Sequence, residues 1–280
     1  KKKKDTEESI NEKRVHPCIK TIKISGNIKA INSIRSIVDC DTIILAVPTQ
    51  NIREIIKDFI LICKTEAIAT ERYNIIICSK GIEVNNNVNL PSEIIESCFT
   101  EENISKDKHP NLVVLSGPNI AEEFLYDLSS TSTIAAYNIT ELKKTGVIKI
   151  FSPLLFIETT DDIIGIQISA ALKNIFALGS GMLVGLKAGH NTQSSYFTSV
   201  IQEMNNAILS AKGKKETLLL SAGVGDLALA CYSTRSRNFQ YGYNLIESNI
   251  ETYQKHRTVE GVYTAKCIVP WETKYKQKLP

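Results

Sequence analysis

The chain has 280 residues, 43% of them hydrophobic and 22% charged, which is an ordinary composition for a globular protein of one large or two average domains. Its formal net charge of +3 is too small to indicate a nucleic-acid-binding protein, and its seven cysteines include no CxxC pair, so neither a disulfide framework nor a metal site is expected. Residues 1–14 are highly charged and unlike a secretory signal, so we expect a cytoplasmic protein with no membrane span.

Predicted strands and helices alternate through the first 160 residues, after a charged segment at 1–20 that we expect to be loosely ordered. Short apolar runs that end at Pro or Gly are typical of strands buried on both faces of a parallel sheet. The predicted strands are 42–47, 74–78, 112–115, 133–136 and 155–159, and the predicted helices are 52–63, 90–99, 120–126 and 141–148. This alternation predicts a Rossmann-like, doubly wound parallel sheet.

Strand signals fade after residue 162. In the stretch 163–186, Lys173 is the single charged residue, and apolar residues go nearly all the way round the predicted helix, which indicates a helix buried on most sides. Its length also fits a membrane span, but the lysine, several polar residues and four glycines make that interpretation unfavourable. Further helices are predicted at 193–211 and 218–232. We therefore expect an α/β domain at 1–162 and an all-helical domain at 163–280.

A lysine inside such a helix has two interpretations. Its stem can pack in the core while the ammonium group reaches solvent. Alternatively, the ammonium group is buried, and desolvation lowers its pKa towards the range where the neutral amine can accept a proton. Spacing alone does not separate the two. Asp226 lies in an apolar stretch and needs a partner, for which Lys173 is a candidate.

Polar or glycine-containing turns follow three of the predicted strands, at 47–50, 79–81 and 116–119. In open α/β sheets, ligands bind beyond the carboxyl ends of the strands, so these turns are candidates for a binding site. For any single turn, Gly and Pro that merely reverse the chain are the simpler explanation, but three turns in consecutive units favour a site. No GxGxxG motif follows a strand, although that turn usually holds a dinucleotide pyrophosphate.

The segment 233–238 (STRSRN) supplies guanidinium and amide donors suited to a phosphate. Taken alone, Arg235 and Arg237 are equally well explained as solvated surface charges.

Six blocks of the sequence together resemble the NAD(P)-dependent glycerol-3-phosphate dehydrogenases, nearer the bacterial branch. They are DTIILAVPTQNIREII (41–56), CSKGIE (78–83), LSGPNIAEEF (115–124), TTDDIIGIQISAALKNIFALGSGMLVGL (159–186), AGVGDLALACYSTRSRN (222–238) and VEGVYTA (259–265). The resemblance implies reversible hydride transfer between NAD or NADP and C2 of glycerol 3-phosphate, giving dihydroxyacetone phosphate, in glycerophospholipid metabolism. It also implies a homodimer.

The resemblance assigns roles to individual residues. Lys173 matches the proton acceptor of the C2 hydroxyl, and Asp226 matches the acidic residue that pairs with this lysine and contacts substrate. The implied substrate-binding residues are Lys80, Gly117, Asn119, Asn174, Asp226, Ser236, Arg237 and Asn238. The implied cofactor-binding residues are Val47, Pro48, Lys80, Ala121, Arg237 and Glu260.

The sequence also departs from the family pattern. The first βα unit with its Gly-rich turn and the C-terminal end are expected to be missing, and three substitutions lie inside the match, namely His190 for Asp, Asn119 for Ser and Ala230 for Thr. These departures leave two alternatives to a glycerol-3-phosphate dehydrogenase. One is a truncated or decayed relative that at most binds a phosphorylated metabolite. The other is a dehydrogenase of the same plan that acts on another hydroxy acid, which the SRN cluster disfavours.

Overall fold

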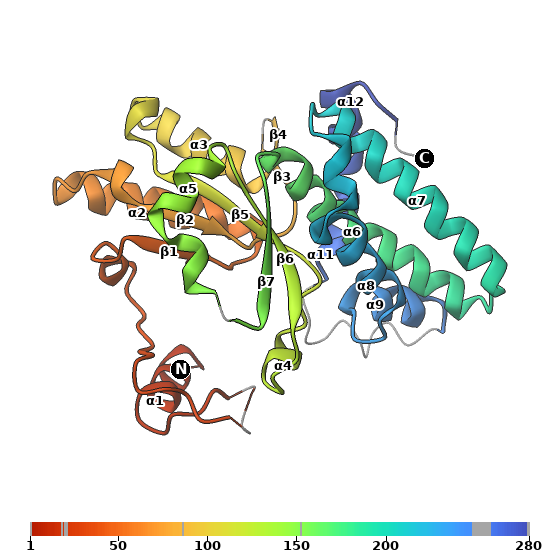
Figure 1. Cartoon of the computed structure of the whole chain (residues 1–280), viewed down its shortest axis with the longest axis horizontal. Helices are drawn as coiled ribbons and strands as arrows, with labels where there is room; N and C mark the ends of the chain where they lie inside the picture. The colour runs from red at the N-terminus through yellow and green to blue at the C-terminus, as the bar shows by residue number, and fades with distance from the viewer. Residues whose placement is uncertain are drawn as a thin grey trace.

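The computed structural model describes residues 2–17, 19, 22–85, 87–151, 153–247 and 259–278. One half of the molecule is a five-stranded sheet with helices on its faces, and the other half is a group of helices packed around α6 (Ile163–Gly185) (Figure 1). A helix near the N-terminus, α1 (Lys2–Asn11), lies to one side of the sheet (Figure 1).

All five predicted strands are present in the sheet. They are β1 (Thr42–Leu45), β2 (Asn74–Ile77), β5 (Asn111–Ser116), β6 (Ser130–Ala136) and β7 (Leu155–Thr160), in the order β1-β2-β5-β6-β7. The first three are parallel, as predicted. The prediction of an all-parallel sheet is wrong for β6, which runs antiparallel to β5, while β7 is parallel to β6. The sheet is therefore mixed.

The helical content of the connection explains the reversal. Between β5 and β6 the chain forms only one helical turn, α4 (Ala121–Phe124), where the sequence predicted a helix over 120–126. A parallel connection usually carries a helix that spans the sheet, and the four-residue α4 does not, so the chain returns antiparallel. Between β6 and β7, helix α5 (Ile139–Thr145) provides such a crossover, and those strands are parallel. The helix predicted over 141–148 ends early at Gly146, which has a positive φ of 73°.

Alternation along β2 divides the sheet core between two faces. Ile75 and Ile77 pack in one cluster with α2 (Ile52–Thr65) and α3 (Pro91–Glu101), whereas Ile76 packs in another cluster with Leu142 of α5. Both faces of the central strands are thus covered, which explains their continuous apolar runs. By contrast, β1 has one neighbouring strand in the sheet, and Ile44 on it is 54% exposed.

Two local features differ from expectation. The charged N-terminal segment is not loosely ordered over its whole length, because α1 forms there and Asn11 exchanges two hydrogen bonds of 2.8 Å with the backbone of Ala30. A short hairpin, β3 (Glu83–Asn85) and β4 (Asn87–Asn89), was not predicted, since its Asn-rich strands lack the apolar pattern of a buried strand.

In the helical half, α6 is packed against α7 (His190–Ser210), α8 (Asp226–Tyr232), α9 (Arg237–Ile246) and α11 (Glu260–Lys266). The last described helix is α12 (Ile268–Tyr275). The contact between α6 and α9 is close, because a Cβ on Gly181 would overlap the backbone of Phe239 and one on Gly242 would overlap that of Leu178. Among the described residues, α6 is the one helix long and apolar enough to cross a membrane, but 78% of its most apolar window is buried within the protein.

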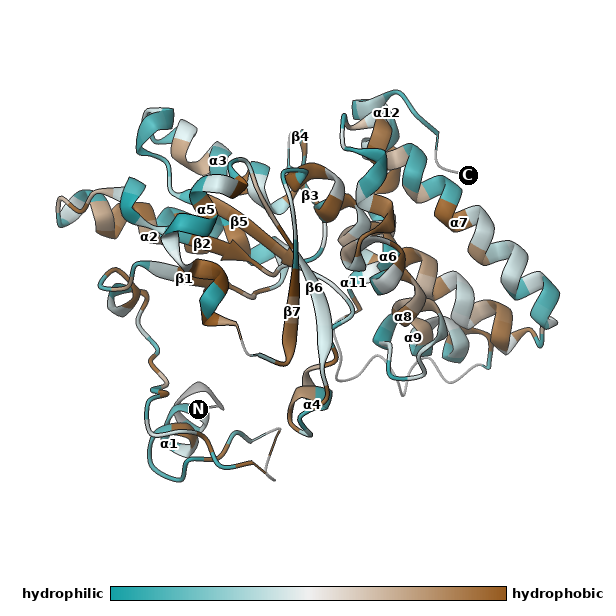
Figure 2. Cartoon of the chain, in the orientation of Figure 1, coloured by the Kyte–Doolittle hydropathy of each residue, from teal (hydrophilic) through white to brown (hydrophobic). Residues whose placement is uncertain are grey.

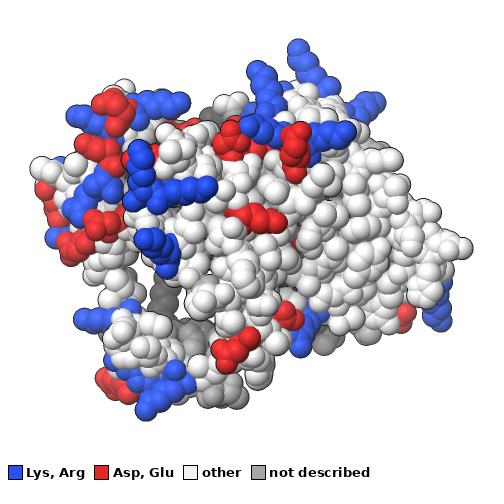
Figure 3. Space-filling view, viewed as in Figure 1, with Lys and Arg blue, Asp and Glu red and all other residues white. Residues whose placement is uncertain are grey.

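Hydropathy and charge are distributed unevenly over these elements. Figure 2 shows apolar colouring on the central strands and on α6, and mostly hydrophilic colouring on the outer side of α7. In the view of Figure 3, charged side chains gather over the sheet half and over α12, whereas the face along α7 is nearly free of them. Glu203 is the only Asp, Glu, Lys or Arg in α7.

The segment 218–232, predicted as one helix, is interrupted. A π-helical turn, Ser221–Gly225, precedes α8, and Gly223 within it has non-helical dihedral angles (φ −89°, ψ −108°). A side chain at Gly223 would overlap the backbone of Leu218, so this kink needs glycine. As a result, Asp226 stands at the first position of a new helix instead of in the middle of a long one.

Candidate active site

A cavity of about 290 Å³ lies where the sheet half meets the helical half. Nine of the residues to which the resemblance assigns a role line it, namely Lys80, Asn119, Lys173, Asn174, Asp226, Ser236, Arg237, Asn238 and Glu260. Residues without an assigned role also line it, namely Ile120, Leu229, Ala230, Ser233 and Arg235. The sequence left Arg235 open between a phosphate ligand and a surface charge; its side chain lines the cavity and is 58% exposed.

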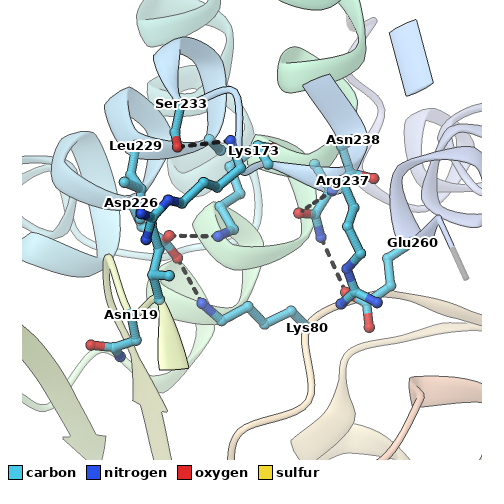
Figure 4. Close-up of a pocket in the computed structure, with 14 residues that line it drawn as sticks. Lys80, Asn119, Lys173, Asp226, Leu229, Ser233, Arg237, Asn238 and Glu260 are labelled. Atoms are coloured by element: carbon cyan, nitrogen blue, oxygen red, sulfur yellow. Dashed lines mark hydrogen bonds and ion pairs between the residues drawn. The ribbon is translucent and has the colours of Figure 1, made fainter. Parts of the chain in front are cut away.

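At the centre of the cavity, two lysines meet one aspartate (Figure 4). Lys173 Nζ of α6 is 2.5 Å from Asp226 Oδ1, and Lys80 Nζ, from the turn after β2, is 2.8 Å from Asp226 Oδ2. The side chains of Lys173, Lys80 and Asp226 are 12%, 23% and 1% exposed. We call these three residues the Lys–Asp–Lys cluster. The interpretation in which the ammonium group of Lys173 escapes to bulk solvent does not agree with this burial.

Burial and charge act in opposite directions on the cluster. Desolvation lowers the pKa of Lys173 to about 8, opposed by the Asp226 carboxylate and assisted by the positive charge of Lys80. Desolvation alone would raise the pKa of Asp226, but the two neighbouring ammonium groups hold it below its usual range. The cluster therefore combines a carboxylate whose pKa is held low with a lysine whose pKa is lowered to about 8.

Polar contacts from the sheet hold the turn that presents Asp226. The carboxylate of Glu158, on β7, accepts a 2.9 Å hydrogen bond from the Ser221 backbone N–H and a 3.1 Å bond from the Thr133 hydroxyl. The Thr133 Oγ1 in turn accepts the Ala222 N–H at 3.1 Å. Two buried or partly buried backbone donors at the start of the π turn thus have acceptors on β6 and β7. Sequence reasoning missed both Glu158 and Thr133, which lie in strands with no motif of their own.

The N-terminus of α9 forms another wall of the cavity. Ser236 is its N-cap and accepts the Phe239 N–H at 3.3 Å, and Arg237 is its first helical residue. Backbone N–H groups and a partial positive charge at such a helix start favour an anion. In Figure 4, Arg237 extends toward Glu260. Burial raises the pKa of Glu260, and the positive charge of Arg237 is the main influence that lowers it.

Asn238 is engaged in bracing three helices. Its Oδ1 accepts the Gly261 N–H of α11 at 3.0 Å, and its Nδ2 donates to Asn174 Oδ1 of α6 at 2.9 Å. Asn174 Nδ2 lies 3.4 Å from Glu260 Oε2. Within the described part of the chain, the Asn238 amide has one N–H left for a ligand, and its other bonds position the surrounding helices.

Some predicted residues lie outside the cavity lining. The carbonyl of Gly117 accepts a 3.3 Å bond from Lys80 Nζ, so this glycine contacts the cluster through its backbone. Ala121 is exposed at the start of α4, and Pro48 is exposed after β1. Val47 lines a separate cavity of about 670 Å³ beside β1, together with Ile34, Ile37 and Ile55.

The three departures from the family pattern fall in different places. Asn119 is paired with Ser132 through bonds of 2.7 and 3.1 Å, and Ala230 lines the cavity as a small apolar residue. His190 is exposed at the first position of α7 and does not line the cavity.

The turns after the carboxyl ends of β1 and β2 are packed together at the edge where a nicotinamide cofactor would bind. Thr49 Oγ1 is buried and has no hydrogen-bond partner among the described residues. A Cβ on Gly81 would come within 2.8 Å of it, so the two turns approach as closely as a glycine allows. The Ser79 hydroxyl joins them by donating to the Val47 carbonyl at 2.6 Å. The turns are thus packed into one rigid edge between the cavity and the 670 Å³ space, a placement that fits the nicotinamide end of a dinucleotide.

Family models match both halves of the chain. The model described as the NAD-dependent glycerol-3-phosphate dehydrogenase N-terminus matches residues 1–142, and that described as its C-terminus matches residues 162–280. The chain belongs to the NAD-dependent glycerol-3-phosphate dehydrogenase family.

Individual relatives agree with this assignment to the glycerol-3-phosphate dehydrogenase family. The chain is 32% identical over 262 residues to a protein of Neorickettsia sennetsu named glycerol-3-phosphate dehydrogenase (NAD(P)+), covering 93% of this chain and 72% of the relative. It is 33% identical to a protein of the same name from Wolbachia pipientis wMel, covering 98% and 83%. Among solved structures, a glycerol-3-phosphate dehydrogenase from Coxiella burnetii superposes with a TM-score of 0.84 at 23% identity, over 99% of this chain and 81% of the other. This structural likeness shows a shared fold.

Proposed function

We propose that the chain catalyses reversible hydride transfer between NAD(P)H and dihydroxyacetone phosphate, giving sn-glycerol 3-phosphate for glycerophospholipid synthesis. The observation that carries this proposal is the Lys–Asp–Lys cluster inside a cavity whose wall is the N-terminus of α9. A proton acceptor and a phosphate-binding end occur in one cavity, as oxidation of a phosphorylated secondary alcohol requires.

Lys173 acts as the proton acceptor for the C2 hydroxyl in the oxidation direction and as the donor in reduction. A pKa of about 8 places this amine close to an operating pH near neutrality, where proton transfer in both directions is effective. Asp226 orients Lys173 through the 2.5 Å contact, and Lys80 balances the carboxylate from the other side. With Asp226 1% exposed, these charges act in a region largely shielded from water.

The phosphate of the substrate binds at the α9 end of the cavity. Ser236, Arg237 and the remaining N–H of Asn238 supply hydroxyl, guanidinium and amide donors there. Asn119, Asn174 and the backbone of Gly117 complete the substrate contacts that we assign. A phosphate held at one end orients C2 toward Lys173, which lowers the entropic part of the barrier.

The cofactor is NAD or NADP, and when bound it accepts a hydride from C2 or returns it. We assign Val47, Pro48, Lys80, Ala121, Arg237 and Glu260 to its binding. The buried carboxyl of Glu260 beside Asn174, and the rigid edge formed by the turns after β1 and β2, support a nicotinamide position next to the Lys–Asp–Lys cluster.

Domain division, location and assembly follow the same proposal. We place the domain boundary near residue 162, with a dinucleotide-binding domain at 1–162 and a catalytic domain at 163–280. Asp162 supports it as the N-cap of α6, accepting the Gly165 N–H at 2.9 Å and the Lys214 N–H at 2.7 Å. We further propose a cytoplasmic homodimer, which sedimentation of the purified protein tests directly.

The deciding experiment is the loss of NADH or NADPH absorbance on mixing the purified chain with dihydroxyacetone phosphate. Turnover that requires the phosphate, with little on dihydroxyacetone, supports the proposal. Equal turnover on an unrelated hydroxy or keto acid would favour another dehydrogenase of the same plan. Absence of turnover, together with binding of glycerol 3-phosphate, would favour the non-catalytic metabolite-binding relative.

A further inference from the structure

Arg235 is the cationic side chain of the cavity that the proposed function leaves unused. It lies in the turn between α8 and α9, one residue before the N-cap Ser236, and its side chain lines the same cavity as Lys173 and Arg237. The turn is held by two bonds to Ser233, from the Arg235 N–H to Oγ at 3.2 Å and from the Ser236 N–H to the carbonyl at 3.0 Å. The backbone of Arg235 is therefore fixed beside the helix start that we assign to the phosphate.

The guanidinium of Arg235 has a weak partner. Its Nη1 lies 3.6 Å from Glu123 Oε1 on α4, which is longer than a hydrogen bond, and the two side chains are 58% and 41% exposed. Exposed ion pairs of this kind contribute little to stability, because solvent screens them and both side chains lose freedom. The pair can therefore open at small cost when a stronger anion arrives.

The cavity lining carries an excess of positive charge, which favours binding of an anion. Four cationic side chains line it (Lys80, Lys173, Arg235 and Arg237), against two carboxylates (Asp226 and Glu260). With all of these side chains ionised, the lining has a formal charge of +1 without Arg235 and +2 with it. A phosphate monoester carries about −1.5 to −2 near pH 7, so Arg235 brings the charge of the site to that of its ligand.

Glu123 and Arg235 also belong to opposite sides of the cavity. Glu123 follows the loop of Asn119 and Ile120, which lines the cavity from the sheet half, whereas Arg235 lines it from the helical half. The carboxylate of Glu123 thus occupies the guanidinium from across the site until a phosphate replaces it.

We propose that Arg235 is a substrate-binding, specificity-determining residue that exchanges Glu123 for the phosphate of the substrate. This inference rests on the proposed function, since it identifies the phosphate as the group that Arg235 selects. A planar guanidinium donates two parallel hydrogen bonds to a phosphate, which makes this pairing strong and directional. The exchange strengthens the binding of phosphorylated substrates and leaves the binding of the corresponding unphosphorylated alcohol or ketone unchanged.

Steady-state kinetics with three variants test the proposal. Arg235→Gln should raise the KM for dihydroxyacetone phosphate about ten-fold or more, as expected for a hydrogen bond to a charged group, with little change in kcat or in the KM for NADH. Arg235→Lys should have a KM for dihydroxyacetone phosphate between those of the wild type and Arg235→Gln, because it keeps the charge and loses the forked donor. Glu123→Gln removes the competing carboxylate and should lower the KM by a few-fold.

The matched control is Arg72→Gln. Arg72 is also a half-exposed arginine paired with an exposed aspartate, Asp41, but it does not line the cavity, so the KM should be unchanged. Circular dichroism melting of each variant separates a lost contact from a lost fold. An unchanged KM in Arg235→Gln would overturn the inference and leave the proposed function standing. An equal loss on dihydroxyacetone would also overturn it, because Arg235 would then act without regard to the phosphate.

Calorimetry keeps the two proposals apart if turnover fails. Glycerol 3-phosphate and glycerol are titrated into the wild type and Arg235→Gln. Weaker binding of glycerol 3-phosphate alone in the variant would uphold the inference even in a protein without dehydrogenase activity. Equal binding by both proteins would overturn the inference, and no binding by the wild type would overturn both proposals.

Discussion

Helix α6 and strand β1 are both apolar in sequence, but they differ in how far neighbouring elements bury them. Helix α6 is packed against four helices and the sheet, and most of its residues are buried, including positions on opposite sides. Among the described residues, β1 pairs with β2 alone, and Ile44 in its middle is 54% exposed. Apolar composition therefore predicts what can be buried, while the number of neighbouring elements decides what is buried.

The difference in burial determines where charged groups interact strongly. The Lys–Asp–Lys cluster requires the enclosed side, because ammonium and carboxylate groups interact strongly only where water is excluded. Val47 and Pro48, assigned to the cofactor, follow β1 on the open side, next to the 670 Å³ cavity. In the proposed mechanism, proton transfer therefore takes place in the enclosed core, and the cofactor binds along an exposed edge. The following predictions test that contrast, beginning with the largest effect.

Replacing the buried base should abolish chemistry and leave the fold intact. Lys173→Ala removes the proton acceptor, and turnover should fall on the order of 10³-fold, within the range for general acid–base groups. The fold should persist because Lys80 still pairs with the buried Asp226. Kinetics and a thermal melt measure both effects. Lys214→Ala, which removes an exposed lysine paired with Asp161, is the control and should be fully active. Unfolding of Lys173→Ala at room temperature would mean that the lysine is structural.

Equal truncations in neighbouring strands should have unequal costs. Ile76→Ala in β2, at a fully buried position, should lower the free energy of unfolding by about 2–5 kcal/mol. Ile44→Ala in β1 should cost less than about 1 kcal/mol, because much of that side chain already contacts water. Urea denaturation measures both values. Equal losses would show that the edge of β1 is covered in solution.

The sheet should support the active site through Glu158. Glu158→Ala leaves the Ser221 N–H and the Thr133 hydroxyl without their acceptor, so the turn before Asp226 should loosen and kcat should fall by about ten-fold. Glu158→Gln keeps an acceptor oxygen and should recover most of the rate. A lower melting temperature with unchanged kcat would instead assign Glu158 to stability alone.

The smallest effect is a shift of the pH profile. Oxidation of glycerol 3-phosphate needs neutral Lys173, so kcat/KM should rise with pH through an apparent pKa of about 8, and the reduction direction should fall over the same range. The positive charge of Lys80 lowers this pKa, so Lys80→Gln should move the profile to higher pH. A profile displaced to lower pH would contradict the assigned sign, and Lys214→Ala should not shift it.

Local patterns were sufficient for the strands of the main sheet and for α6. The continuous apolar runs predicted all five strands of the main sheet, and the single charge in 163–186 predicted the buried helix α6. An aspartate in an apolar stretch required a partner, and Lys173, 53 residues away, provides it. These predictions succeed because periodicity and the cost of burying a charge are properties of the sequence itself.

Only the tertiary structure decided the direction of β6, the place of Lys80 in the cluster and the contacts of Glu158 and Arg235. The one-turn link α4 reverses β6, although the strand pattern is the same in either direction. Lys80 meets Asp226 across 146 residues, and no spacing rule connects the two. Side chains of this kind acquire their roles when separate elements pack together, because a charge is buried or exposed only by neighbours that come from elsewhere in the chain.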